Sequence, residues 1–269
     1  MFITRAISSV VLVIIMVGIF LLGAPATGVA VMLISIKGVQ ELLRVFKLDK
    51  SIYAVIAYIA TVAYYVVLLF GLQEYALALI VVYLLLVLSV YVFSYPKYTD
   101  KDMMGAFLAF IYVSVMLSYI YQIRALEPSG LVLVFLIFVS SWINDVFAYL
   151  VGKTIGKHKM TPKLSPKKSV EGFIGGIVGA GIAGMIFGYV YNIFVEPMAH
   201  SVLIFGVIGA IGAIPAVIGD LAASAIKRNH DVKDYGHLIP GHGGILDRFD
   251  SVIFTAPIVY YLLSIMANF

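Results

Sequence analysis

Long apolar runs follow one another along almost the whole chain, and they decide what it can fold into. Each run is close to the ~20 residues that a helix needs to cross a bilayer, and glycines, prolines or charged clusters separate the runs. Hydrophobic residues make up 62% of the 269 residues and charged residues 12%, whereas a water-soluble domain carries about 25% charged residues. We therefore predict an all-α, polytopic integral membrane protein.

The runs predict about nine transmembrane helices. The first run follows Arg5, so a signal peptide is an alternative reading of it. The second contains Lys37, Glu41 and Arg44, which also fits a re-entrant or interfacial helix. The predicted spans are 6–22, 26–46, 52–71, 74–95, 103–122, 131–151, 171–192, 200–226 and 251–267.

Basic residues fall almost entirely on one side of these spans. Of the 18 Lys and Arg residues, only Arg124 lies in a loop on the other side, and Lys37 lies inside a span. The positive-inside rule then places the N-terminus in the cytoplasm. We expect a multi-pass protein of the inner (plasma) membrane with its chemistry on the cytoplasmic face. The absence of cysteine excludes disulfides, thiol nucleophiles and cysteine-ligated metals.

A first polar stretch begins at Asp145, inside the sixth predicted span, and continues as a basic segment that we expect to form a loop. Six lysines lie between positions 153 and 168, which favours binding of phosphates or lipid headgroups. Charge alone does not separate these two ligands, but the interleaved glycines would let backbone N–H groups approach an anion. Ser165, Lys167 and Lys168 are the candidate phosphate contacts.

A second polar stretch begins at Asp220, inside the eighth predicted span. Helical spacing puts Asp220, Ser224 and Lys227 on one stripe, and Asp231 would extend it. Further along, Asp247 and Asp250 share a helical face if the last helix has already begun there.

Four carboxylates, those of Asp145, Asp220, Asp247 and Asp250, are predicted to lie within one or two helical turns of the same membrane face. An ionised aspartate inside a span costs about 2.5–3.5 kcal/mol, so these groups call for a compensating cation. Oxygen ligands suit Mg²⁺ rather than zinc. The alternative for Asp145 and Asp220 is neutralisation by a Lys or Arg of another helix.

Small residues recur every four positions in the seventh span and cluster in the eighth. Such stripes allow helices to pack closely in lipid, so we predict that these two helices meet. The stripes comprise Gly172, Gly176, Ala180, Gly184 and Gly188, and Gly206, Gly209, Ala210 and Ala213.

The segment from Ser224 to Asp250 resembles the signature of the phosphatidate cytidylyltransferases, also called CDP-diacylglycerol synthases. Its elements are Ser-Ala-Ile-Lys-Arg, Lys-Asp-Tyr-Gly, Pro-Gly-His-Gly-Gly and Asp-Arg-Phe-Asp. The segment from Gly152 to Gly176 is also similar to the family. The resemblance covers roughly the C-terminal half of the chain.

The resemblance implies that CTP and phosphatidic acid yield CDP-diacylglycerol and pyrophosphate in phospholipid biosynthesis. It implies a requirement for Mg²⁺, with one or two ions bound, and a homodimer surrounded by membrane lipids. We expect no nucleic-acid partner. Residues 1–130 would form a helical scaffold with the dimer contacts, and residues 131–269 would form the catalytic region.

The resemblance and the polar pattern together give each candidate residue a role. Asp220 and Asp247 would hold metal, with Asp145 and Asp250 as further ligands. The catalytic set would be Asp220, Asp247, Asp250, Lys227 and Arg228. Substrate would contact Ser165, Lys167, Lys168, Ser224, Lys233, Asp234, Arg248 and the turn formed by Gly241, His242, Gly243 and Gly244.

Two other functions fit parts of the pattern. A CTP-dependent lipid-alcohol kinase would use a similar acidic and basic site but would transfer the γ-phosphoryl group. A cation transporter could use Asp145 and Asp220 along its pathway, but it leaves the clustered lysines unexplained.

Overall fold

The computed structural model describes residues 2–239, 241 and 243–266, with side chains from residue 7 onward. Its contacts divide the chain into two compact units, Met1–Tyr121 with His230–Arg248, and Gln122–Asn229 with Phe249–Phe269. Both units are built from helices, so the all-α prediction is confirmed. The predicted division of roles between residues 1–130 and 131–269 stays a prediction.

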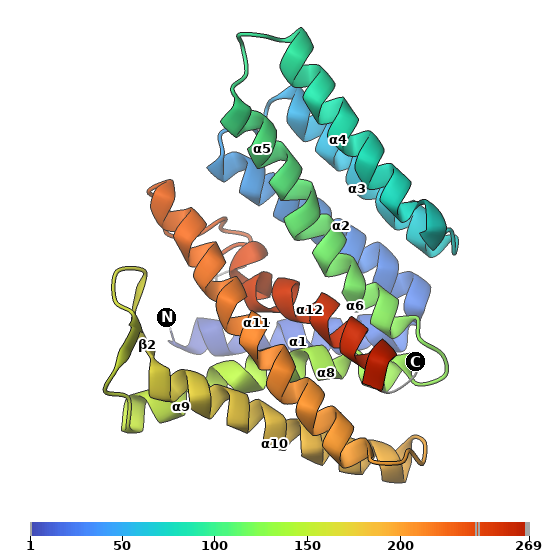
Figure 1. The fold of residues 1–269 in the computed structure, drawn as a ribbon, viewed down its shortest axis with the longest axis vertical. Helices are drawn as coiled ribbons and strands as arrows, with labels where there is room; N and C mark the ends of the chain where they lie inside the picture. Colours follow the sequence, from blue (N-terminus) through green and yellow to red (C-terminus); the bar gives the residue numbers. More distant parts are fainter. Residues whose placement is uncertain (1, 240, 242, 267–269) are drawn as a thin grey trace. The chain divides into compact units, whose positions relative to one another are not determined.

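The first unit contains the N-terminal helices (Figure 1). They are α1 (Phe2–Leu21), α2 (Ala24–Val45), α3 (Ile52–Leu69), the 3₁₀ turn η1 (Gln73–Tyr75), α4 (Ala76–Phe93), α5 (Asp100–Ala109), the π-helical segment η2 (Phe110–Val115) and the start of α6 (Met116–Arg124). A capping box fixes where α5 begins, since the Thr99 side chain accepts from the Asp102 N–H and the Asp102 carboxylate accepts from the Thr99 N–H.

A buried polar network ties three elements of the first unit together. The Ser35 hydroxyl on α2 lies 2.8 Å from the Tyr65 hydroxyl on α3. Thr61, also on α3, bonds the Ser114 hydroxyl of η2 at 2.7 Å, and Tyr65 donates to the Ser114 carbonyl at 3.2 Å. Hydroxyl groups in an apolar interior need such partners, so the network specifies how α2, α3 and η2 pack.

The second unit contains the remaining helices and a short hairpin (Figure 1). They are α7 (Gly130–Leu133), α8 (Phe135–Phe138), the π-helical segment η3 (Val139–Ile143), α9 (Asn144–Thr154), β1 (Lys159–Thr161), β2 (Ser165–Ser169), α10 (Val170–Phe194), α11 (Ser201–Asn229) and most of α12 (Leu246–Met266). The strands pair antiparallel, with Lys159 opposite Ser169 and Thr161 opposite Ser165. Hence the basic segment that we expected to be a loop forms a hairpin.

Eight helices in the described part of the chain are long and apolar enough to cross a membrane, which confirms the multi-pass architecture. They are Ala24–Val45, Ile52–Leu69, Gln73–Phe93, Asp100–Arg124, Gly130–Thr154, Val170–Phe194, Ser201–Asn229 and Leu246–Met266. The first predicted span, 6–22, coincides with α1 (Phe2–Leu21), whose apolar segment with described side chains is Ile7–Leu21. The count of nine therefore stays a prediction.

The predicted contact between the two small-residue stripes is confirmed in α10 and α11 (Figure 1). A Cβ built on Gly209 would lie 2.5 Å from the Ala180 carbonyl oxygen and 3.4 Å from the Gly184 Cα. Backbone thus packs directly on backbone, which is possible only where side chains are small. This contact joins α10, which follows β2, to α11, which carries Asp220.

Two predicted boundaries were wrong. Helix α11 ends at Asn229, and Asp231 lies beyond it with a positive φ of 54°, so Asp231 does not extend the stripe of Asp220. Helix α12 begins at Leu246, which is before the predicted start at residue 251. Both Asp247 and Asp250 are therefore helical, as the prediction of a shared face required.

Candidate active site

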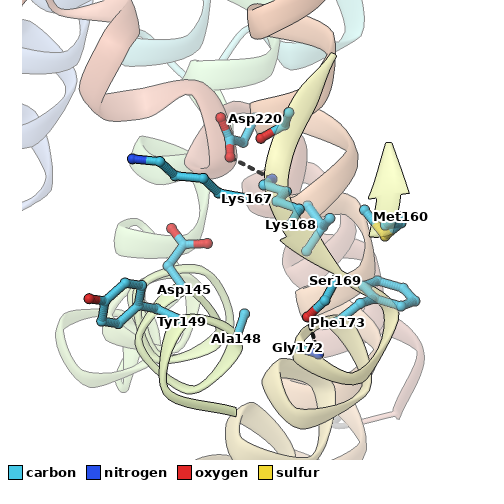
Figure 2. Close-up of a pocket in the computed structure, with 12 residues that line it drawn as sticks. Asp145, Ala148, Tyr149, Met160, Lys167, Lys168, Ser169, Gly172, Phe173 and Asp220 are labelled. Carbon is cyan, nitrogen blue, oxygen red and sulfur yellow. Dashed lines mark hydrogen bonds and ion pairs between the residues drawn. The ribbon is translucent and has the colours of Figure 1, made fainter. Parts of the chain in front are cut away.

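A pocket of about 280 Å³ lies within the second unit. Three elements supply its polar side chains (Figure 2): α9 contributes Asp145, β2 contributes Ser165, Lys167 and Lys168, and α11 contributes Asp220. All five were predicted to be site residues. The fold thus brings together the first polar stretch and the beginning of the second.

Local structure explains how the hairpin presents its lysines. Ser169, the last residue of β2, caps α10 by accepting from the Gly172 N–H at 3.1 Å. A Cβ on Gly152, Gly156 or Gly172 would lie 3.0 Å or less from the Ser169 hydroxyl. Packing thus explains why glycine occupies these positions, because a larger residue would collide with Ser169. The cap fixes the end of the strand that carries Lys167 and Lys168.

Lys168 and Asp220 form an ion pair inside the pocket. The Lys168 Nζ lies 2.5 Å from the Asp220 Oδ2, and the two side chains are 25% and 34% exposed. The Nζ atom itself is buried and has no hydrogen-bond partner among the described residues beyond this ion pair. Figure 2 shows that Lys168 points toward Asp220 whereas Lys167 extends away from it. Asp220 is thus neutralised by a cation, but one from a strand rather than from another helix.

Asp250 belongs to the same electrostatic cluster. It lies on the part of α12 that belongs to the second unit, and its Oδ1 accepts from the Ser251 N–H at 2.8 Å. The charges of Asp220, Lys227 and Asp145 act on its carboxyl group. Ser224, Lys227 and Arg228 follow Asp220 along α11. The second unit therefore brings the charged groups of Asp250, Lys227, Asp145 and Asp220 within electrostatic reach of one another.

These carboxylates are compatible with Mg²⁺ only together with further ligands. No group of three or more Asp, Glu or His side chains within the described residues could hold a metal ion by itself. Mg²⁺ is, however, usually bound by one or two carboxylates together with waters and substrate phosphates. Asp145 and Asp220 line a pocket that also contains lysines suited to phosphate, so the donor set fits a metal that arrives with a nucleotide.

The remaining part of the signature lies in the first unit and is centred on Asp247. Asp247 is buried, with 7% of its surface exposed. The Oδ2 atom accepts from the Tyr235 N–H at 2.8 Å and from the Gly244 N–H at 2.9 Å. Gly243 has a φ of 84°, a conformation that favours glycine, and a Cβ there would lie 2.6 Å from the Asp247 Oδ2. The turn is thus folded around the Asp247 carboxylate.

Sequence reasoning missed one residue that holds this turn in place, Glu41 of α2. Its carboxylate accepts from the Ile245 N–H at 3.1 Å and the Leu246 N–H at 3.0 Å. Its presence within an apolar run was the available signal, but that signal was interpreted only as a doubt about the span.

The other predicted residues of the signature occupy the surface of the first unit. Lys233, Asp234 and Arg248 are exposed, and Gly241 has a φ of 75°. His242 lies outside the described residues. The roles assigned to all these residues stay predictions.

Comparison with known proteins identifies the family of the chain. The profile of the Cytidylyltransferase family matches residues 3–266. The chain belongs to the cytidylyltransferase family. It is 35% identical over 197 residues to the phosphatidate cytidylyltransferase of Bacillus subtilis (strain 168), covering 73% of this chain and 71% of that protein.

Two further relatives of the chain are also phosphatidate cytidylyltransferases. The phosphatidate cytidylyltransferase of Staphylococcus aureus (strain COL) is 32% identical over 180 residues, which are 66% of this chain and 65% of that protein. The one from Synechocystis is 33% identical over 139 residues, 52% of this chain and 45% of that protein. In both, the aligned segment spans less than two thirds of the relative.

Proposed function

We propose that this member of the cytidylyltransferase family transfers a cytidylyl group from CTP to phosphatidic acid, giving CDP-diacylglycerol and pyrophosphate. The observation that carries the proposal is the pocket lined by Asp145, Asp220, Lys167 and Lys168, in which Lys168 pairs with Asp220. Phosphoryl-type transfer depends mainly on neutralising charge and on positioning the reacting groups. Acidic and basic side chains in one pocket meet both needs.

In the proposed reaction, a phosphate oxygen of phosphatidic acid attacks the α-phosphorus of CTP. The new P–O bond forms as the bond between the α-phosphorus and the bridging oxygen breaks, and pyrophosphate leaves with that oxygen. Lys167 and Lys168 would neutralise the phosphates in the pocket, where low polarity strengthens their effect. Lys227, Arg228 and Lys233 would stabilise charge on the triphosphate and the lipid phosphate. A pocket of about 280 Å³ is near the lower end for small-molecule sites, so it suits the phosphates rather than the whole nucleotide.

Mg²⁺ is part of the proposal. When bound, one or two such ions would neutralise the phosphates and fix their orientation. Asp145 and Asp220 would provide oxygen ligands, with Asp250 and Asp247 as further candidates. The Lys168 ion pair orients the Asp220 carboxylate, and a phosphate entering the pocket would give Lys168 a second anionic partner. We further propose that the site faces the cytoplasm and that the enzyme is a homodimer in the inner membrane.

The assay that tests the proposal uses purified protein in phosphatidic acid liposomes with Mg²⁺. CTP labelled at the α-phosphate should leave its label in the lipid product, whereas a lipid-alcohol kinase would transfer only a γ-label. Ion flux without nucleotide would instead favour the transporter.

Replacing Asp220 with Asn should lower turnover by about a thousandfold while the protein remains folded, because a charged ligand of the Mg²⁺ that would neutralise the reacting phosphates is lost. Asp100→Asn, at the exposed start of α5, is the matched control and should be as active as the wild type. Retention of activity by Asp220→Asn would rule out its assignment as a metal ligand.

A further inference from the structure

Glu41 is a charged side chain buried inside a membrane-spanning helix of the first unit. Only 1% of its surface is exposed, and it lies on α2, one of the eight candidate spans. An acidic group in such a place usually marks a functional site and needs partners that satisfy it. The reaction proposed above gives it no role.

The partners of Glu41 are backbone groups of the signature, more than 200 positions away in the sequence. One carboxylate oxygen accepts from the Ile245 N–H at 3.1 Å, and the other accepts from the Leu246 N–H at 3.0 Å. Helix α12 begins at Leu246, and the first N–H groups of a helix have no partner within it. Glu41 therefore caps α12 with a side chain from a different helix.

Two glycines of the signature lie directly against the same carboxylate. A Cβ on Gly236 would lie 2.5 Å from the Glu41 Oε1, and a Cβ on Gly244 would lie 2.5 Å from its Oε2. Both glycines are buried. Close approach to Glu41 is thus a sufficient reason for glycine at both positions.

The turn held by Glu41 also holds Asp247. The N–H of Gly244 donates to the Asp247 Oδ2 at 2.9 Å, while a Cβ on the same residue would lie 2.5 Å from the Glu41 Oε2. Asp247 follows directly on the two residues that donate to Glu41. A shift of this turn must therefore change where the Asp247 carboxylate points.

We propose that Glu41 is a positioning residue, which fixes the turn at Gly244–Leu246 and so sets the orientation of Asp247 for substrate. The inference rests on the proposed function for what Asp247 does. Glu41 itself touches only the protein. Partners that orient a metal or phosphate ligand typically contribute 10- to 100-fold to affinity or activity, and the same range is expected here.

Glu41→Gln is the informative variant, because glutamine keeps the shape but has only one oxygen to accept the two N–H groups. Ser35→Ala is the matched control: it lies on the same helix and removes a buried hydrogen bond to Tyr65 without touching the turn. Two measurements are made on each full-length protein in detergent. One is hydrogen exchange of the peptide covering residues 243–250, and the other is equilibrium binding of labelled CTP with MgCl₂ and without phosphatidic acid.

Glu41→Gln should speed exchange in this peptide and weaken CTP binding at least about tenfold, whereas Ser35→Ala should change neither. Unchanged exchange would overturn the inference, since the turn would not depend on Glu41. Faster exchange with wild-type affinity would also overturn it, because Glu41 would then be purely structural. Failure of the wild-type protein to bind CTP would instead overturn the proposed function itself. The exchange measurement would still report whether Glu41 holds the turn.

Discussion

The close contact between α10 and α11 holds together the elements that line the pocket. Replacing Gly209 with alanine tests how much this contact contributes to stability. The new Cβ would lie 2.5 Å from the Ala180 carbonyl oxygen, about 0.9 Å short of ordinary contact at 3.4 Å. The obstructing atom belongs to helical backbone, so it cannot rotate away as a side chain could. Overpacking of this kind costs about 1–3 kcal/mol, and alanine returns about 1 kcal/mol through helix propensity. With the cost at its upper end, the net loss is about 2 kcal/mol.

A loss of this size should lower the unfolding temperature by about 4–8 °C, since each kcal/mol corresponds to about 2–4 °C in chains of similar length. Thermal unfolding in detergent measures the shift. Gly18→Ala, where nothing lies within 4 Å of the new Cβ, and Gly181→Ala, where the nearest atom is the Ala210 Cβ at 3.3 Å, are graded controls. CTP turnover should fall with stability, because Lys168, on the strand that leads into α10, and Asp220, on α11, would be moved apart. If Gly209→Ala unfolds no earlier than Gly18→Ala, the close-packing argument is wrong.

Two other substitutions test the hairpin. Lys168→Met should raise the KM for CTP about tenfold or more, because it removes a cation from the phosphate pocket. The control, Lys163→Met in the exposed turn, should leave initial rates unchanged. Equal KM values for both variants would contradict the assignment of Lys168 as a phosphate contact. Glu171→Gln should weaken the contacts of Glu171 with the backbone N–H of His158, at 3.2 Å, and with its Nδ1, at 2.6 Å, so limited trypsin digestion should cleave the hairpin faster. An unaltered cleavage rate would show that this pair does not hold the hairpin.

Much of the candidate site could be predicted from the sequence, because charge is scarce in an apolar chain. Asp145 and Asp220 were identified as ionisable residues inside spans, where each must have a partner. Lys167 and Lys168 were identified from local charge density. What could not be predicted was that Lys168 alone of the two pairs with Asp220. That choice depends on the alternation of side chains along β2, and the hairpin itself was not expected.

Glu41 shows the limit of local patterns most clearly. Its position in an apolar run indicated only that the span was unusual. Its partners, Ile245 and Leu246, are remote in sequence, and no periodicity links them to α2. Of the two glycines that accommodate its carboxylate, Gly244 had been predicted only as part of a turn that contacts substrate. The structure shows that glycine is also needed at these positions because the Glu41 side chain of α2 packs against them.

The sequence by itself determined that this protein spans a membrane many times, that α10 and α11 meet along small residues, and which polar segments are candidates for the active site. These properties follow from hydropathy and helical spacing, which are local. Only the tertiary structure decided that Lys168 neutralises Asp220, that Gly152, Gly156 and Gly172 pack against Ser169, and that Glu41 caps α12. Each of these depends on a close approach between residues far apart in the chain, and such an approach is fixed by packing rather than by composition.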